Sequence, residues 1–156
     1  MKAKAVVLIL VALCFVGVAV SYGADDAFMG TWKLNEAKSK FGPGAGKNTT
    51  VVYEAAGDSV KVTTDGTGPD GAAVHSEWTG KFDGKDYPVT GSPTSDMRSY
   101  KKVDDHTLAI TVKKGGKVTD SGRIVVSADG KTRTVTTHGT DAQGNKTSST
   151  AVYDKQ

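Results

Sequence analysis

Alternation of apolar and polar residues with a period of two is the dominant pattern of this chain. It runs through residues 60–64, 74–82 and 108–112, where Val, Leu, Ile and Trp alternate with Lys, Thr and Glu. Successive side chains of a β-strand point to opposite faces, so each run predicts a strand with one face toward a core and the other toward water. Helical periodicity is nearly absent after residue 23.

Turn dipeptides separate these runs. Asp65-Gly66, Asp83-Gly84, Gly115-Gly116 and Asp129-Gly130 are pairs that permit the positive φ angles of tight hairpins. Longer hairpin loops are expected at 104–105 and 141–144. Runs and turns together predict ten strands, near 28–34, 48–55, 58–65, 72–80, 81–89, 96–103, 106–113, 117–127, 131–139 and 145–154.

Short strands joined in chain order form a meander, which has two exposed edges unless it closes. The prediction is therefore an all-β fold, a single antiparallel up-and-down β-barrel of about ten strands. Residues 35–40, flanked by Gly42-Pro43-Gly44, form the one short segment that could be helical, and we expect it to lie as a plug across one barrel end. A flattened barrel without a cavity is the alternative architecture.

The first strand carries the residues expected to close the barrel base. Gly30 lets the backbone bend sharply, and Trp32, two positions later, points to the same face and fills the narrowing end. Phe41 is assigned a structural role as well. None of the three is expected to contact a ligand.

The N-terminus indicates export. Lys2 and Lys4 precede a nearly unbroken apolar run over 6–20, and small residues follow, which is the pattern of a secretory signal peptide over 1–23. A membrane-spanning helix is the disfavoured alternative. Residues 24–156 are then one secreted or periplasmic domain without cysteine, because Cys14 leaves with the leader, and no stable membrane insertion is expected.

The charge of that domain excludes an obvious polyanion partner. Removing Lys2 and Lys4 leaves 18 basic against 17 acidic residues. No basic face indicates nucleic-acid binding. The sequence does not determine an oligomeric state.

Catalytic and metal-binding patterns are weak. His75 and Glu77 could share one strand face, but two ligands do not make a zinc site, and His138 is a lone histidine near a turn. No Gly-x-Ser-x-Gly motif or other nucleophile arrangement is present in the sequence. We therefore expect no metal, no cofactor and no enzymatic activity.

Several segments resemble one family. Residues 28–34 (FMGTWKL), 108–117 (LAITVKKGGK), Arg123, residues 136–140 (TTHGT) and 150–155 (TAVYDK) are similar in type, order and spacing to the first and last strands of the fatty-acid-binding proteins, within the lipocalin-like (calycin) group. The resemblance implies a closed barrel that binds an apolar ligand. The stretch from Trp32 to Phe41 also resembles a set of uncharacterised small secreted bacterial proteins.

The family holds a ligand carboxylate with arginines and a tyrosine of the last strands. Arg123 and Tyr153 match two of these residues, whereas Ala151 stands where the second arginine is expected, and Arg133 is the candidate substitute. Alternation places Arg123 on the Val125 face and leaves open which face is the interior.

The predicted function is non-covalent binding or carriage of a small, mainly apolar ligand with a polar head. Trp78, Tyr100 and Phe82 would line the ligand, and Arg123, Arg133 and Tyr153 would meet its polar end. The alternative is a protein-interaction or inhibitor-type domain that uses hairpin loops, such as residues 66–71, on a filled barrel.

Overall fold

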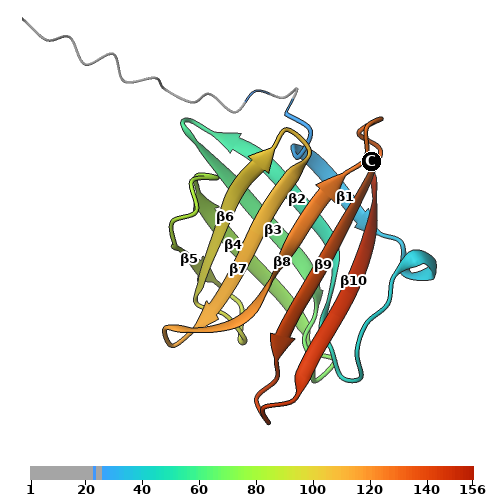
Figure 1. Ribbon diagram of the computed structural model, residues 1–156, viewed down its shortest axis with the longest axis vertical. Coiled ribbons are helices and arrows are strands. Elements are labelled where there is room, and N and C mark those ends of the chain that lie inside the picture. The colour runs from blue at the N-terminus through green and yellow to red at the C-terminus, as the bar shows by residue number, and fades with distance from the viewer. Residues whose placement is uncertain (1–22, 24–25) are drawn as a thin grey trace, which may run out of the picture.

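The computed structural model describes Gly23 and residues 26–156. The predicted leader, residues 1–23, lies outside this part of the chain except for Gly23. Ten antiparallel strands close into a barrel, which confirms the predicted fold class (Figure 1). The strands are β1 Gly30–Leu34, β2 Lys47–Ala56, β3 Ser59–Thr67, β4 Ala73–Gly80, β5 Tyr87–Thr90, β6 Met97–Asp104, β7 Thr107–Lys114, β8 Lys117–Val126, β9 Thr132–Thr140 and β10 Lys146–Lys155, with one 3₁₀ turn, η1 Glu36–Lys38.

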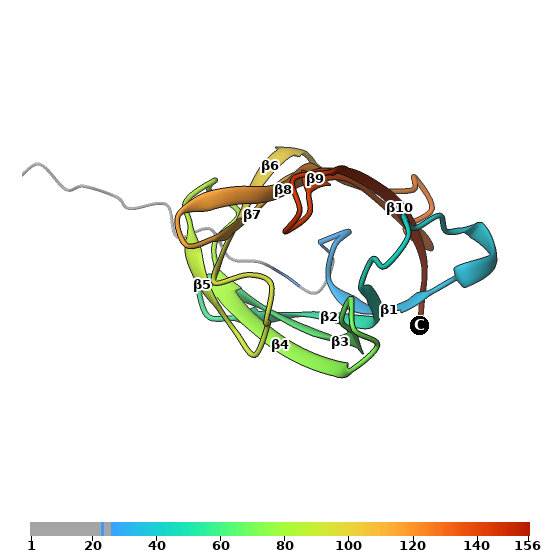
Figure 2. The same ribbon diagram turned by 90° about the horizontal axis from the view of Figure 1, so that it is seen from below.

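The barrel closes between its first and last strands. β1 pairs with β2 on one side and with β10 on the other, in a register that puts Trp32 opposite Lys155 and Leu34 opposite Tyr153. Every other strand pairs with its neighbours in sequence, so the ring is continuous when viewed along its length (Figure 2). Closure pairs both edges that an open meander would leave exposed.

The fifth strand differs from its prediction at 81–89. β5 begins only at Tyr87, because Asp83 organises a turn before it. Oδ1 of Asp83 accepts a hydrogen bond from the backbone N–H of Lys85 at 2.9 Å, and Oδ2 accepts one from the Tyr87 hydroxyl at 2.9 Å. The prediction of a turn at Asp65-Gly66 is also wrong. Both residues lie inside β3, and the chain turns at 68–72 instead.

The segment after β1 is not a plug. η1 buries none of its residues, and the chain around it runs along the outside of β10 (Figures 1 and 2). Ser39 Oγ accepts the backbone N–H of Val152 at 2.9 Å, and Lys40 forms an isolated bridge with Thr150. A short polar turn has no apolar face to bury, so hydrogen bonds to a neighbouring strand stabilise it better than insertion would.

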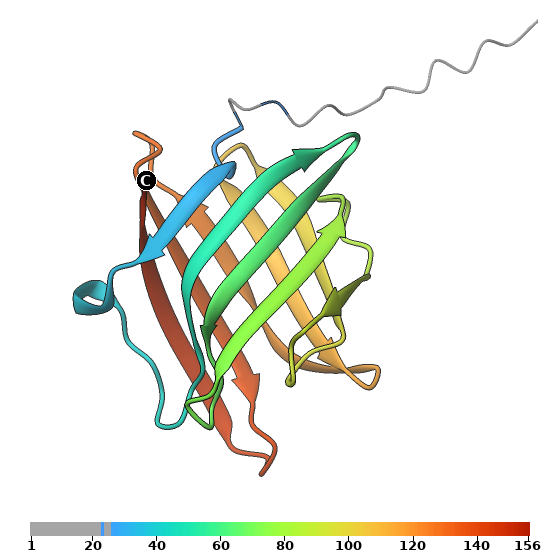
Figure 3. The same cartoon turned by 180° about the vertical axis from the view of Figure 1, so that it is seen from behind.

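The segment before β1 closes the barrel end in its place. Phe28 is completely buried, and Met29 is nearly so. The carbonyl oxygen of Phe28 accepts a hydrogen bond from the indole N–H of Trp32 at 3.0 Å. The Phe28 ring packs edge-on against the Phe82 ring, with 6.0 Å between their centroids. In Figure 2 this segment lies within the outline of the ring. We call this the N-terminal end, and the opposite end, which carries the β3–β4, β7–β8 and β9–β10 hairpins, the far end (Figure 3).

Gly30 occupies a conformation that other residues avoid, with φ at +104°. A Cβ there would also lie 3.1 Å from Cε of Lys155. Trp32 is fully buried in the interior, whereas Phe41 is only half-buried at the edge of the core, with the Lys47 amine 5.3 Å from its ring centroid. No helix formed by the described residues is long and apolar enough to cross a membrane.

Candidate functional site

Arg133, the second residue of β9, points into the barrel. It pairs with Val126 and Tyr153, whose side chains are buried, and only 3% of its own surface is exposed. The centre of its guanidinium lies 4.6 Å from the ring of Tyr153, 5.1 Å from Tyr53 and 5.5 Å from Trp32. These distances place the cation among aromatic faces, which attract it electrostatically.

Arg98, on β6, is a second inward-facing arginine. It lies two residues from Tyr100, so both side chains share the inner face. Its Nη1 donates to the Tyr100 hydroxyl at 3.3 Å. Arg98 is not among the site residues predicted from the sequence, although the Arg98-x-Tyr100 spacing would place both side chains on one face of a strand.

Neither arginine is neutralised. Within residues 26–156, no carboxylate forms an ion pair with Arg98 or Arg133. Nε and Nη1 of Arg133 and Nε of Arg98 are buried and make no hydrogen bond to any described group. A buried cation with unused donors is unfavourable unless something else compensates it. We refer to Arg98, Arg133, Tyr53, Tyr100 and Tyr153 as the interior arginine site.

Two tyrosines of this site, Tyr53 and Tyr153, have pKa values raised by burial. Burial, followed by the proximity of Tyr100, raises the pKa of Tyr53, against a smaller opposing effect of both arginines. Burial also raises the pKa of Tyr153, and Arg133 opposes it. The pKa of Arg98 is raised as well, because the proximity of Tyr100 and Tyr53 outweighs the lowering effect of burial. The guanidiniums and the protonated phenols of Tyr53 and Tyr153 together present hydrogen-bond donors to the interior.

An aromatic cluster adjoins the site. The ring of Tyr100 lies 4.7 Å from Trp78, 5.8 Å from Phe82 and 6.3 Å from Tyr53, in edge-to-face arrangements. The Trp78 indole N–H donates to the carbonyl oxygen of Arg98 at 2.9 Å. The structure thus brings Trp78, Tyr100 and Phe82 together, and their ring contacts cross the interior from β2 to β6. This level of the barrel is filled by side chains.

Nearer the far end, the inner wall is made of small hydroxyl residues. Thr64 and Ser76, on β3 and β4, have their hydroxyl oxygens 2.5 Å apart. Thr137 and Ser149, on β9 and β10, have theirs 2.8 Å apart. Paired hydroxyls of this size occupy little volume and leave a polar wall.

Arg123 does not belong to the interior site, contrary to the prediction. It is exposed on the outer face of β8, between the inward-facing Gly122 and Ile124. Alternation had grouped it with Val125, which is 44% exposed. The buried side chains of Ile124 and Val126 identify the other face as the interior, so Arg133 and Tyr153 lie inside without Arg123.

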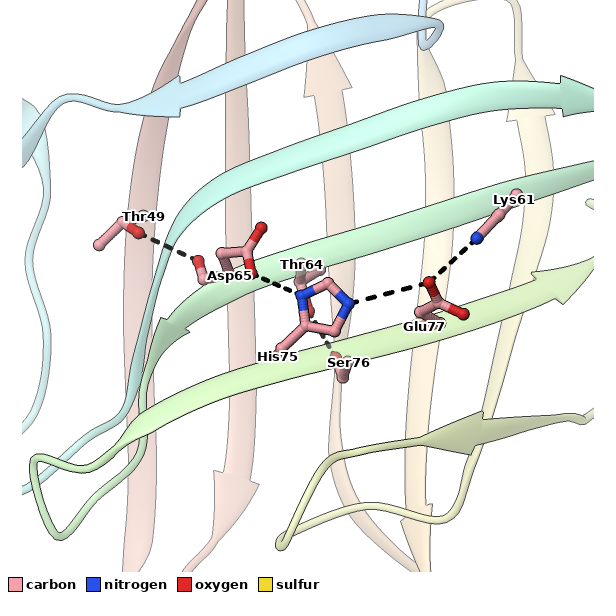
Figure 4. Close-up of polar contacts among 7 residues, drawn as sticks. All are labelled: Thr49, Lys61, Thr64, Asp65, His75, Ser76 and Glu77. Carbon is pink, nitrogen blue, oxygen red and sulfur yellow. Dashed lines mark hydrogen bonds and ion pairs between the residues drawn. The ribbon is translucent and has the colours of Figure 1, made fainter.

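The His75–Glu77 pair belongs to a chain of charges on the outer face of β3 and β4 (Figure 4). His75 Nδ1 lies 2.6 Å from Asp65 Oδ1, and its Nε2 lies 3.8 Å from Glu77 Oε1, which the Lys61 amine approaches at 2.9 Å. The hydrogen bond to Asp65 raises the pKa of His75. No group of three or more metal-ligating side chains suited to a metal ion was found among the described residues.

Comparison with known proteins gives little further information. No family model matches the chain, and no curated protein matches it. A solved structure of EF1p2_mFAP2b bound to DFHBI is similar in shape, with a TM-score of 0.48 and 15% sequence identity, over 85% of this chain and 97% of that one. A likeness at this level does not extend to function.

Proposed function

We propose that the protein binds a small, partly apolar anion inside the barrel, with the anionic group held by the interior arginine site. The observation that carries this proposal is a pair of inward-facing guanidiniums that form no ion pair with a carboxylate of the described residues. Each also keeps buried donor atoms without a hydrogen-bond partner, Nε and Nη1 in Arg133 and Nε in Arg98. An anion would supply both the missing charge and the missing acceptors.

The surroundings favour an anion with an apolar body. The rings of Trp78, Tyr100 and Phe82 offer edges and faces for apolar contact, and protonated tyrosines add donors at the polar end. The segment before β1 closes the N-terminal end, so the proposed ligand would enter from the far end, past small hydroxyl residues. A carboxylate, sulfonate or phenolate attached to a ring or short chain fits these requirements.

A pair of fluorescent probes tests the charge requirement directly. Anilinonaphthalene sulfonate is an aromatic anion, and N-phenylnaphthylamine has the same ring system without the sulfonate. We expect the purified protein to bind the sulfonate more tightly. Arg133→Met and Arg98→Met should each weaken sulfonate binding by roughly tenfold or more, the size of a lost charge-assisted hydrogen bond, with little change for the neutral probe.

Arg123→Met is the matched control, because it removes the same group from the outer face of the barrel. It should leave both affinities unchanged. Equal binding of the two probes, or an equal loss in Arg123→Met and Arg133→Met, would show that no anion is held by the interior arginines.

The alternative from another class is a protein-interaction or inhibitor-type domain. The filled aromatic level favours it, since a solid barrel needs no ligand. Failure of a broad panel of anions and lipophiles to bind would support this alternative. The same proposal includes export directed by the N-terminal segment, kinship with the lipocalin-like group and the lack of enzymatic activity. Secretion of a reporter protein fused to residues 1–23 tests the export.

A further inference from the structure

A pocket of about 480 Å³ lies on the far-end surface of β8, β9 and β10, apart from the interior arginine site. It forms where β8 and β9 separate. Their pairing ends at Asp120 opposite Gly139. Lys117 and Val118 pair with β7 and not with β9, and Thr119 is paired with neither strand, while β9 and β10 stay paired to Thr140 and Lys146. Figures 1 and 3 show β8 bending toward β7 at this end while the β9–β10 hairpin projects beyond it.

Local features of the strands permit this separation. The register of β7 and β8 shifts between Val112 and Lys113, which turns the first residues of β8 away from β9. Gly139 allows the remaining contact, because a Cβ there would lie 2.3 Å from both the Thr119 carbonyl oxygen and Asp120 Oδ1. The pocket is thus formed by the pairing of the strands themselves.

Most side chains of the pocket are hydroxyls, with one histidine and one lysine. Ser121, His138 and Ser148 form one row across β8, β9 and β10, on the face opposite the inward-facing Thr137 and Ser149. No residue that the structure describes forms a side-chain hydrogen bond with any of the three. The lining is completed by Thr140 and Lys146, which pair with each other beside this row, and by Val118, Thr119, Gly139 and Thr147.

The nearest carboxylates do not line the pocket. Asp120 packs against Gly139 from the inner side of the sheet. Asp141, in the β9–β10 hairpin, accepts hydrogen bonds from the backbone N–H groups of Gln143 and Asn145 and from the Asn145 amide. The outer-facing Arg123 lies two residues beyond Ser121 and adds positive charge beside the row. Charge and free donors therefore both favour an anion.

We propose that this pocket binds an oxyanion group, a phosphate or a sulfate, through Lys146, His138 and the hydroxyls of Ser121 and Ser148. Serine hydroxyls donate to oxyanion oxygens, and the lysine amine supplies a mobile point charge. The pocket is larger than a bare oxyanion requires and falls within the range of small-molecule sites, about 300–1,000 Å³. The hydroxyl-rich lining leaves room for a hydroxylated carrier of that group, such as a sugar.

Two-dimensional amide NMR tests this assignment with four probes at constant ionic strength: sodium phosphate, sodium sulfate, glucose 6-phosphate and glucose. We expect saturable shifts at 118–121, 138–140 and 146–148 with the three oxyanions and none with glucose. Tighter binding of glucose 6-phosphate than of phosphate identifies an ester as the source, and equal binding identifies the free anion.

Substitutions distinguish binding of the oxyanion in this pocket from its nonspecific attraction to positive charge on the protein surface. Lys146→Ala should weaken oxyanion binding by about tenfold, and Ser148→Ala should weaken it several-fold. Lys131→Ala removes the same charge at the opposite end of β9 and should have no effect. Absence of saturable shifts, an equal response to glucose, or equal losses in Lys146→Ala and Lys131→Ala would overturn the proposal.

Discussion

Replacing Arg133 with methionine should make the protein more stable while weakening its binding of anions. Methionine fills a similar volume without a charge. The change removes two buried donors that lack partners, Nε and Nη1, each of which is unfavourable by about 1–3 kcal/mol. It also removes the attraction of the guanidinium to three aromatic rings, together worth roughly 2–4 kcal/mol at this depth.

The midpoints of these ranges, about 4 kcal/mol gained and about 3 kcal/mol lost, leave a net stabilisation of about 1 kcal/mol, as seen when buried charges are replaced by apolar groups. For a domain of this size it corresponds to an increase in Tm of about 3–5 °C. Urea and thermal unfolding, followed by tryptophan emission and circular dichroism without added anion, measure it. Arg123→Met, on the exposed face, is the control and should change stability by less than about 0.5 kcal/mol.

A destabilisation of more than about 1 kcal/mol in Arg133→Met would refute this reasoning. It would mean that the aromatic rings already compensate the buried cation, so that the interior does not require an anion. In that case the arginine would be a structural residue and the filled-barrel alternative would gain support.

Three further predictions concern the outer face and the barrel base. Because the pKa of His75 is raised in the fold, its pair with Asp65 stabilises the protein below the unfolded pKa, and this contribution is lost as pH rises through the folded pKa. Asp65→Asn should lower the His75 pKa in an NMR titration, and an unchanged value would contradict the pairing. Gly30→Ala should destabilise the protein by about 1–2 kcal/mol in urea unfolding, because alanine is strained at that φ; a neutral change would show that the strand relaxes. Phe28→Ala should lower unfolding free energy by about 3–5 kcal/mol and half-buried Phe41→Ala by less, and the reverse order would assign the plug to the later segment.

The strands and the closed barrel could be predicted from the sequence because both depend on local pattern. Period-two alternation and paired turn residues specify hairpins without knowledge of the rest of the chain. Closure then follows from the need to pair both edges. The turn at Asp83-Gly84 was predicted from its residues, but the start of β5 was placed too early, at residue 81. That start depends on the contacts of the Asp83 carboxylate with Lys85 and Tyr87, which no alternation pattern shows.

The facing of individual arginines could not be predicted with the same success. A shift of one residue moves a side chain from the interior to the solvent, and β-bulges introduce such shifts. Arg123 follows a register shift between β7 and β8, and the family resemblance placed it inside. Its neighbours Ile124 and Val126 gave the better signal, because a pair of aliphatic residues at alternate positions marks the buried face.

The two proposed sites use opposite faces of one strand, and this separates their tests. Arg133 points into the barrel from the start of β9, and His138 points outward five residues later, about 16 Å away at the usual rise of a strand. Substitutions so far apart, with no shared partner, should act independently. Arg133→Met should therefore leave phosphate shifts at residues 138–140 unchanged, and Lys146→Ala should leave binding of anilinonaphthalene sulfonate unchanged. If either variant abolished both activities, the two sets of residues would be one coupled site or the barrel would have lost its structure, and unfolding curves of the same variants distinguish these cases.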